Sequence, residues 1–503
     1  MVRACRDGSG PLGRDIEEIR FTREDRQRYR EKVKACLEVL RRMREAEMFE
    51  VGRKLIGVEV EFYVVDVDGE PMMINAELLN RIESEDFQTE LAQFNIEFNL
   101  APHKLNGTVF REIEEELETS FDHAYRRAEE LDAKVAMVGV IPTLRDLHVT
   151  IQNLSANPRY HLLNEQILEA RGEDLSVEIE GQEKLALKMS SIAMEAAATS
   201  VQLHLQVSPQ GFAAAWNAAQ AASAAQVAAG ANSPFLLGKE LWRETRIALF
   251  QQAIDTRSEE LTAQGVRPRV WFGERWIDDV MDLFDENVRY FPALLPLVED
   301  EDPATELERG AIPRLPELVL HNGTIWRWNR PVYGIARGKP HLRVENRVLP
   351  AGPTMVDIVA NAAFYFGLIR GLTEMDPPLP RQLSFQAAHD NFFRAARDGI
   401  DSELFWPGVG EVPASELILR TLLPIAHAGL DGWGVDRRDR DHYLGIIEQR
   451  ALKRLTGASW QVRSFRNLLD RADSRDQAIT EMTRQYLIGM RSNEPVHTWP
   501  IPR

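Results

Sequence analysis

The stretch GVEVEF, residues 57–62, alternates polar and apolar side chains with the period of two that is typical of a β-strand. Glu59 and Glu61 would share one face of this strand, and the apolar residues between them would share the other. The sequence therefore predicts a strand over residues 54–67 that has an apolar face for the core and a face that carries two carboxylates.

Three further segments show the same alternation, and each has an unusual polar face. They are NIEFNL at residues 95–100, SVQLHLQV at 200–207 and HLRVENRV at 341–348. Ordinary solvated strand faces favour Thr, Ser and Lys. Here the polar positions are instead Asn95, Glu97, Asn99, Ser200, Gln202, His204, Gln206, Arg343, Glu345 and Arg347.

Taken singly, each segment also fits a half-solvated strand of an antiparallel sheet. If the strands share one sheet, the carboxylates that converge are Glu59, Glu61, Glu97 and Glu345. Carboxylates that close repel one another unless cations neutralise them. Since Mg²⁺ prefers oxygen ligands and commonly takes substrate phosphates as well, we expect a Mg²⁺–nucleotide site on the polar face of the sheet.

The expected fold class is α+β, with a curved and mainly antiparallel sheet, helices on its apolar side and a helical C-terminal part. Helical patterns cover residues 24–46, 110–131 and 158–168, and almost the whole chain from residue 354 onward. Asp376-Pro377-Pro378 is the best place to divide the chain. The predicted units are a flexible tail (1–22), a mixed body (23–375) and a helical C-terminal region (376–503).

Composition limits the classes of partner. The formal net charge of −18 argues against nucleic acid as a partner, because proteins that follow a phosphate backbone carry a basic surface. Two cysteines outside any Cys-x-x-Cys pair fit a reducing cytoplasm. The N-terminus lacks the hydrophobic centre of a signal peptide. The nearest candidate for a membrane span, residues 212–231, is interrupted by polar residues, so no membrane association is expected.

These motifs together resemble the glutamate–cysteine ligases, within the glutamine-synthetase-like carboxylate–amine ligases. The resemblance covers residues 54–372 and rests on six motifs in the order of the family. No one of these motifs is decisive alone. The resemblance implies that residues 23–375 form the catalytic domain. The motifs lie at residues 57–61, 90–102, 157–160, 199–205, 231–246 and 344–347.

The resemblance implies a role for each candidate residue. It implies that two or three Mg²⁺ ions are bound by Glu59, Glu61, Glu97 and Glu345. It implies substrate contacts for Glu90, Gln202, His204 and Arg159, and contacts with the transferred phosphoryl group for Arg246 and Arg347. His204 stands where many relatives have Asn.

Each of these residues also has a purely structural interpretation. Arg246 would be a surface residue of a helix, and Arg159 would extend the first turn of another. Gln202 and His204 would be hydrogen-bonded sheet residues, and Arg347 would pair with its neighbour on the same strand face.

The resemblance implies an ATP-dependent ligase that joins the γ-carboxylate of glutamate to the amine of cysteine through an acyl phosphate. The sequence contains no Walker-type Gly-x-x-x-x-Gly-Lys-Ser/Thr loop, which fits a nucleotide held by metals on a sheet. Two alternatives remain, namely the same chemistry with another amine and a non-catalytic nucleotide-binding relative. The sequence leaves the oligomeric state open, a homo-oligomer included.

Overall fold

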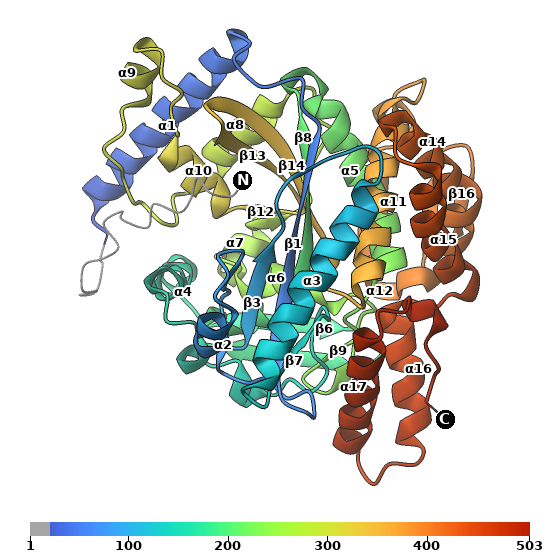
Figure 1. Ribbon diagram of the computed structural model, residues 1–503. Helices are drawn as coiled ribbons and strands as arrows, with labels where there is room; N and C mark the ends of the chain where they lie inside the picture. Colours follow the sequence, from blue (N-terminus) through green and yellow to red (C-terminus); the bar gives the residue numbers. More distant parts are fainter. Residues whose placement is uncertain (1–20, 503) are drawn as a thin grey trace.

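A computed structural model describes residues 21–502, so the predicted tail lies almost wholly outside the described residues. Its centre is an antiparallel sheet in the order β13-β14-β8-β1-β3-β2, with β4 and β5 also paired to β1 (Figure 1). The strands are β1 (Leu55–Val65), β2 (Phe87–Thr89), β3 (Asn95–Asn99), β4 (His103–Lys104), β5 (Lys134–Ala136), β8 (Ser200–Val207), β13 (Asn329–Ala336) and β14 (Lys339–Pro350). All the segments predicted as polar-faced strands are thus neighbours in one curved sheet.

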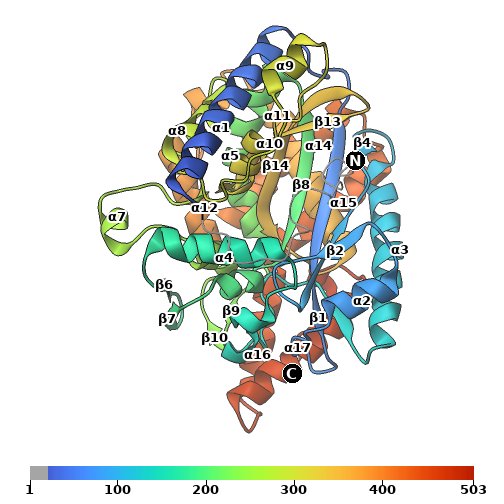
Figure 2. The same ribbon diagram turned by 90° about the vertical axis from the view of Figure 1, so that its left-hand side faces the viewer.

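Helices lie on both sides of this sheet (Figures 1 and 2). The helices of the body are α1 (Arg23–Glu45), α2 (Asn75–Ile82), α3 (Val109–Glu129), α4 (Pro158–Arg171), α5 (Pro209–Gly230), α6 (Thr245–Ala253), α7 (Glu259–Ala263), α8 (Val280–Tyr290), α9 (Pro303–Glu308), α10 (Pro316–Gly323) and α11 (Met355–Thr373). The later helices are α12 (Phe385–Asp398), α13 (Ala414–Leu417), α14 (Leu423–Trp433), α15 (Arg437–Lys453), α16 (Gly457–Leu469) and α17 (Arg475–Arg491).

The apolar face of the sheet forms the core with α3, α5 and α11. Phe62, on the face of β1 opposite the glutamates, packs against Phe121 of α3 with ring centroids 5.9 Å apart. Since the apolar members of the alternating strands point into this layer, their polar members are left on the concave side. The predicted fold class, an α+β fold with a helical C-terminal part, is confirmed.

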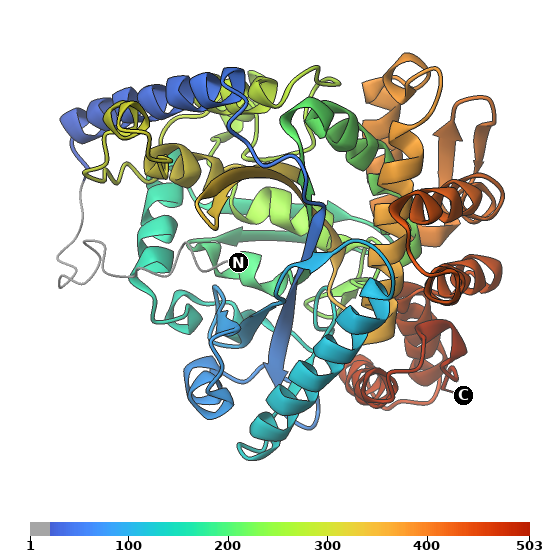
Figure 3. The same cartoon turned by 45° about the horizontal axis from the view of Figure 1, so that its top comes forward.

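The C-terminal helices form a further layer outside α11 (Figure 3). A Cβ atom on Gly429 of α14 would lie 1.9 Å from the carbonyl oxygen of Gly367 in α11, so these helices cross at a distance that only glycine allows. The division of the chain near residue 375 stays a prediction.

Within residues 21–502, one helix, α11, is long and apolar enough to cross a membrane by length and composition alone. This corrects the expectation that residues 212–231 are the nearest candidate. Because 89% of the apolar window of α11 is buried inside the protein, it has the character of a core helix.

Candidate active site

The four glutamates predicted as metal ligands lie on neighbouring strands of the sheet. Each faces a polar residue of the adjacent strand, because all of them occupy polar positions of the alternating pattern. The cross-strand pairs are Glu61 with Glu97 (β1, β3), Glu59 with Gln202 (β1, β8) and Glu345 with His204 (β14, β8). The structure thus brings the predicted carboxylates together on one face.

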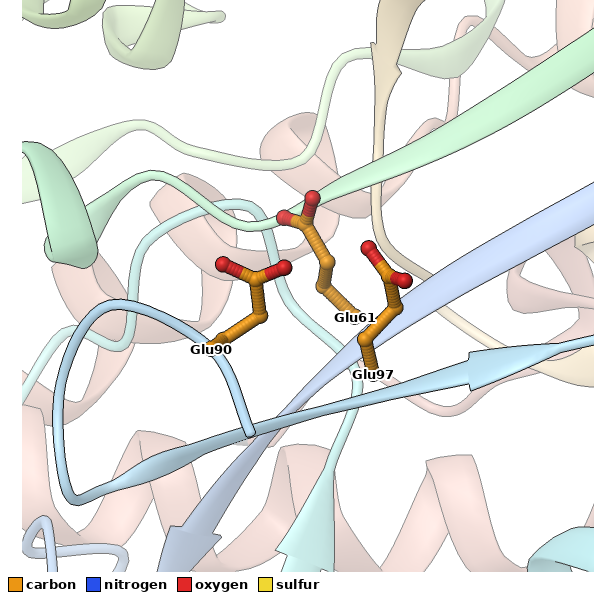
Figure 4. Close-up of side chains that lie close together, drawn as sticks. All are labelled: Glu61, Glu90 and Glu97. Atoms are coloured by element: carbon orange, nitrogen blue, oxygen red, sulfur yellow. The ribbon is translucent and has the colours of Figure 1, made fainter. Parts of the chain in front are cut away.

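Glu61 and Glu97 form an acidic triad with Glu90, which was predicted to contact substrate. One carboxylate oxygen of each lies within 4.8 Å of the other two, and the three side chains point toward one another (Figure 4). Glu90 follows β2, and the chain turns between β2 and β3, so its side chain reaches the triad although the strand period alone would not place it there.

Neighbouring polar groups fix the orientation of the triad. Glu61 accepts hydrogen bonds from the Ser200 backbone N–H (2.6 Å), the Ser200 hydroxyl (3.0 Å) and Nε2 of Gln202 (3.1 Å). Glu97 accepts a hydrogen bond from Nδ2 of Asn99 (2.8 Å). These donors hold the carboxylates of Glu61 and Glu97 in place. Gln202 also accepts a hydrogen bond from Arg347 of β14, so it positions the triad relative to that strand.

The electrostatics of the triad favour a bound cation. Burial raises the pKa of Glu97 to about 8, and the nearby Glu59 and Glu61 contribute to this shift. Burial, and then Glu97 and Glu61, raise the pKa of Glu90 well above its usual range. Burial also raises the pKa of Glu61, although Arg347 and Ser200 partly offset the effect. An all-oxygen, acidic donor set of this kind fits Mg²⁺, which would replace the protons.

The pKa shifts predict how Mg²⁺ binding depends on pH. The pKa of Glu97 is about 8 in the folded protein and about 4.5 when the chain is unfolded. Protonated Glu97 therefore stabilises the metal-free protein below about pH 4.5, and this stabilisation is lost as the pH rises through about 8. Mg²⁺ should therefore raise the melting temperature more at about pH 8 than at about pH 6, because it no longer competes with protons. Scanning fluorimetry with and without MgCl₂ measures this, and an equal Mg²⁺ effect at both pH values would contradict it.

A second part of the site contains the carboxylates of Glu59 and Glu345, each of which is paired with basic side chains. Nε2 of His204 lies 3.0 Å from Oε1 of Glu59. Although burial alone would raise the pKa of Glu59, His204 lowers it below its usual value. For Glu345, Arg330 and Arg347 outweigh burial in the same way and lower the pKa strongly. These two carboxylates are therefore charged at neutral pH.

Arg347 connects the two regions. Its Nη1 donates to Oε1 of Glu345 (2.7 Å) and to Oε1 of Gln202 (2.8 Å). Its Nε is buried and has no hydrogen-bond partner among residues 21–502. A held guanidinium with an unused donor suits an incoming phosphate or carboxylate oxygen.

Arg246 lies behind Arg347 rather than beside it. It is 3% exposed, pairs with Glu244 (3.1 Å), and donates to the carbonyl oxygens of Arg347 and Val348. The pairing of β14 with β8 is irregular between residues 346 and 349, and Arg246 satisfies the carbonyls freed there. The structure thus places Arg246 against the backbone that carries Arg347, and its direct contact with a phosphoryl group stays a prediction.

Two further charged residues lie near the starts of α4 and β8. Arg159 is exposed in the first turn of α4, outside the glutamate cluster, so its substrate contact also stays a prediction. Sequence reasoning missed Glu195, which precedes β8 in an alanine-rich 3-10 helix (Ile192–Ala197). Burial raises the pKa of Glu195 to about 8, Glu61 adds to this, and Arg347 opposes it. No motif or strand period marks this residue.

Comparisons with known proteins agree with this architecture. The family model of glutamate–cysteine ligase family 2 matches residues 55–435. The solved glutamate–cysteine ligase of Francisella tularensis in complex with AMP is 12% identical, with a TM-score of 0.53 over 89% of this chain and 90% of that chain. At this identity the likeness shows the fold alone.

More distant likenesses come from other solved structures. A bifunctional glutathione synthetase from Pasteurella multocida is 12% identical, with a TM-score of 0.46 over 91% of this chain and 55% of that chain. The ligase PafA, in complex with the prokaryotic ubiquitin-like protein Pup, is 10% identical, with a TM-score of 0.37 over 86% of this chain and 71% of that chain. No curated protein matches the sequence.

Proposed function

Because the chain belongs to glutamate–cysteine ligase family 2, a family of ATP-dependent carboxylate–amine ligases, we propose that it joins the γ-carboxylate of L-glutamate to the amine of L-cysteine. The products are γ-glutamylcysteine, ADP and phosphate. The observation that carries the proposal is the acidic triad of Glu61, Glu90 and Glu97, which Gln202 connects to Arg347 through hydrogen bonds. A cytoplasmic location is part of the proposal, since the substrates are cytoplasmic metabolites.

The first step needs positioning and charge neutralisation more than covalent chemistry by the protein. An oxygen of the γ-carboxylate attacks the γ-phosphorus of ATP, the bond to the β-phosphate oxygen breaks, and ADP leaves. Mg²⁺ bound by the triad, with Glu59 and Glu345 as further ligands for a total of two or three ions, would neutralise the phosphate oxygens. Arg347 donates its free Nε–H to the moving phosphoryl group and is held in position by Glu345 and Gln202.

Arg246 acts on this step through Arg347. Its guanidinium fixes the backbone at residues 347 and 348, so the side chain of Arg347 starts from a rigid point of the sheet. Gln202 has a similar positioning role, because it donates to Glu61 and accepts from Arg347. His204 holds Glu59 in its charged form.

The second step requires the amine in its neutral form. We propose that Glu195 is the base that accepts the proton from the amine. The amine attacks the carbonyl carbon of the acyl phosphate, the C–O bond to phosphate breaks, and the amine loses a proton. A carboxylate whose pKa is about 8 is half ionised at about pH 8, so it can accept this proton there. The electrostatic neighbours of Glu195, namely Glu61 and Arg347, are those assigned to the first step.

Replacing Glu195 with Gln should lower kcat for cysteine by roughly a hundredfold, because a positioned base contributes about that much. Hydroxylamine is already neutral near pH 8, so it needs no base to become a nucleophile. With hydroxylamine as the amine, the kcat of Glu195→Gln should therefore be close to that of the wild type. The measurement is ADP formation with each amine, and the matched control is Glu178→Gln on an exposed strand position. An equal loss with both amines would indicate a structural role only.

A screen for ADP release tests the proposed function. Purified protein with Mg²⁺, ATP and glutamate should release ADP only when an amine is added, and cysteine should be the best amine of a panel of amino acids and amino sugars. A better rate with another amine would support the same chemistry with a different acceptor. Binding of Mg-ATP without turnover for any amine would overturn the proposal in favour of a nucleotide-binding relative.

A further inference from the structure

A pocket of about 380 Å³ lies away from the glutamate cluster. Its wall comes from α1, α4, α7 and the segments around residues 266–269 and 290–294. Figure 2 shows α1, α4 and α7 on the same side of the molecule. None of the residues in the acidic triad or its hydrogen-bond partners lines it. Its volume falls in the range of pockets that bind small molecules.

The wall of this pocket includes a buried arginine, Arg269, that has no carboxylate partner in the described part of the chain. Arg269 is 2% exposed, and its guanidinium donates to the carbonyl oxygens of Thr324 (3.0 Å) and Pro292 (2.6 Å). Its Nε has no hydrogen-bond partner within residues 21–502. Burial lowers the pKa of Arg269 to about 10, and the nearby phenol of Tyr29 partly opposes this shift. A buried charge without a counter-ion is costly, and a bound anion would compensate it.

Three more arginines line the same pocket, although each of them already has an acidic partner. Their partners are Glu169 for Arg26, Asp255 for Arg257 and Glu274 for Arg267. A pocket with this many guanidinium groups is unusual in a chain with a formal net charge of −18. Since these three arginines are paired with acidic side chains, Arg269 supplies the uncompensated positive charge that favours an anion in the pocket.

We propose that this pocket binds a small organic anion through its carboxylate or phosphate group, with Arg269 as the main contact. Guanidinium groups bind both kinds of oxyanion in a fork, and the three neighbouring arginines supply further N–H donors. Arg269 donates a hydrogen bond to the carbonyl oxygen of Thr324. The carbonyl oxygen of the preceding residue, Gly323, accepts a hydrogen bond from Arg330. Arg330 also donates to the carboxylate of Glu345 in the active site. The pocket is thus connected to the active-site strand β13 by two consecutive residues.

Calorimetry on the full chain without Mg²⁺ tests the proposal, with inorganic phosphate and citrate as probes. The wild type should bind at least one probe, and the one that binds more tightly gives the class of the anion. Arg269→Met should weaken this binding about tenfold to a hundredfold, in line with the loss of charge-assisted hydrogen bonds. The exposed Arg309 gives the matched control Arg309→Met, which should bind as the wild type does.

Two further variants separate the pocket from the active site and from a folding defect. Arg347→Gln removes the free guanidinium of the active site and should leave probe binding unchanged. Ala293→Trp fills the pocket while keeping Arg269, and should abolish binding in a protein that still melts cooperatively. The proposal is overturned if the wild type binds neither probe, if Arg347→Gln loses the binding, or if Ala293→Trp retains it.

Discussion

Replacing Glu97 with Gln is expected to lower the rate of ADP formation by roughly a hundredfold or more and to raise the Mg²⁺ concentration needed for half-maximal activity. Glu97 contributes a carboxylate to the triad, and removing one metal ligand costs more than the ten- to hundredfold typical of outer residues. Gln has the same shape and can still accept the hydrogen bond from Asn99. Since the pKa of Glu97 is raised to about 8, a neutral side chain is also what the metal-free fold carries at neutral pH.

The measurement is a Mg²⁺ titration of ADP formation, accompanied by a thermal melt. Glu77→Gln, on the exposed side of α2, is the matched control and should behave as the wild type does. The melting temperature of Glu97→Gln without metal should equal or exceed that of the wild type at about pH 8, because a buried charge is gone. Wild-type activity at every Mg²⁺ concentration would remove the triad from the mechanism.

Replacing Arg347 with Lys should lower kcat by roughly a thousandfold while changing the affinity for Mg-ATP much less. The planar guanidinium reaches Glu345 and Gln202 with one nitrogen and keeps Nε free, whereas a lysine has a single donor group. An arginine that stabilises a transferring phosphoryl group contributes at least this much in other enzymes. A loss confined to the transition state lowers kcat and kcat/KM together.

Single-turnover measurements of ADP formation separate this effect from product release. Arg337→Lys, in the exposed turn between β13 and β14, is the matched control and should retain full activity. If Arg347→Lys changes only the apparent affinity for ATP and leaves kcat intact, Arg347 binds the substrate without stabilising its reaction.

The two faces of each central strand could be predicted from the sequence because each strand alternates with a period of two. The side chains at 59, 61, 97 and 345 all occupy the polar face, and a shift of one residue would have placed them in the core. Binary alternation therefore determined both the apolar core and the acidic face. The likeness of the motifs to a known family added expected roles for the residues on the acidic face, whereas the order of the strands in the sheet was not predicted.

Other features depended on contacts that no local pattern contains. Glu90 reaches the triad only because the chain turns between β2 and β3. Arg246 is on a helix that the sequence identified, but its burial against the irregular part of β14 follows from tertiary packing. Glu195 and Arg269 are single charged residues in segments without periodicity, and their importance comes from burial alone.

The most direct test of the central claim follows oxygen from glutamate into phosphate. Glutamate labelled with ¹⁸O in its γ-carboxylate is incubated with ATP, Mg²⁺, the best amine and the protein, and the released phosphate is analysed by mass spectrometry. Attack of the carboxylate on the γ-phosphorus transfers one ¹⁸O atom to phosphate in each turnover, together with one ADP. Phosphate that contains no ¹⁸O, or release of AMP in place of ADP, would contradict the account.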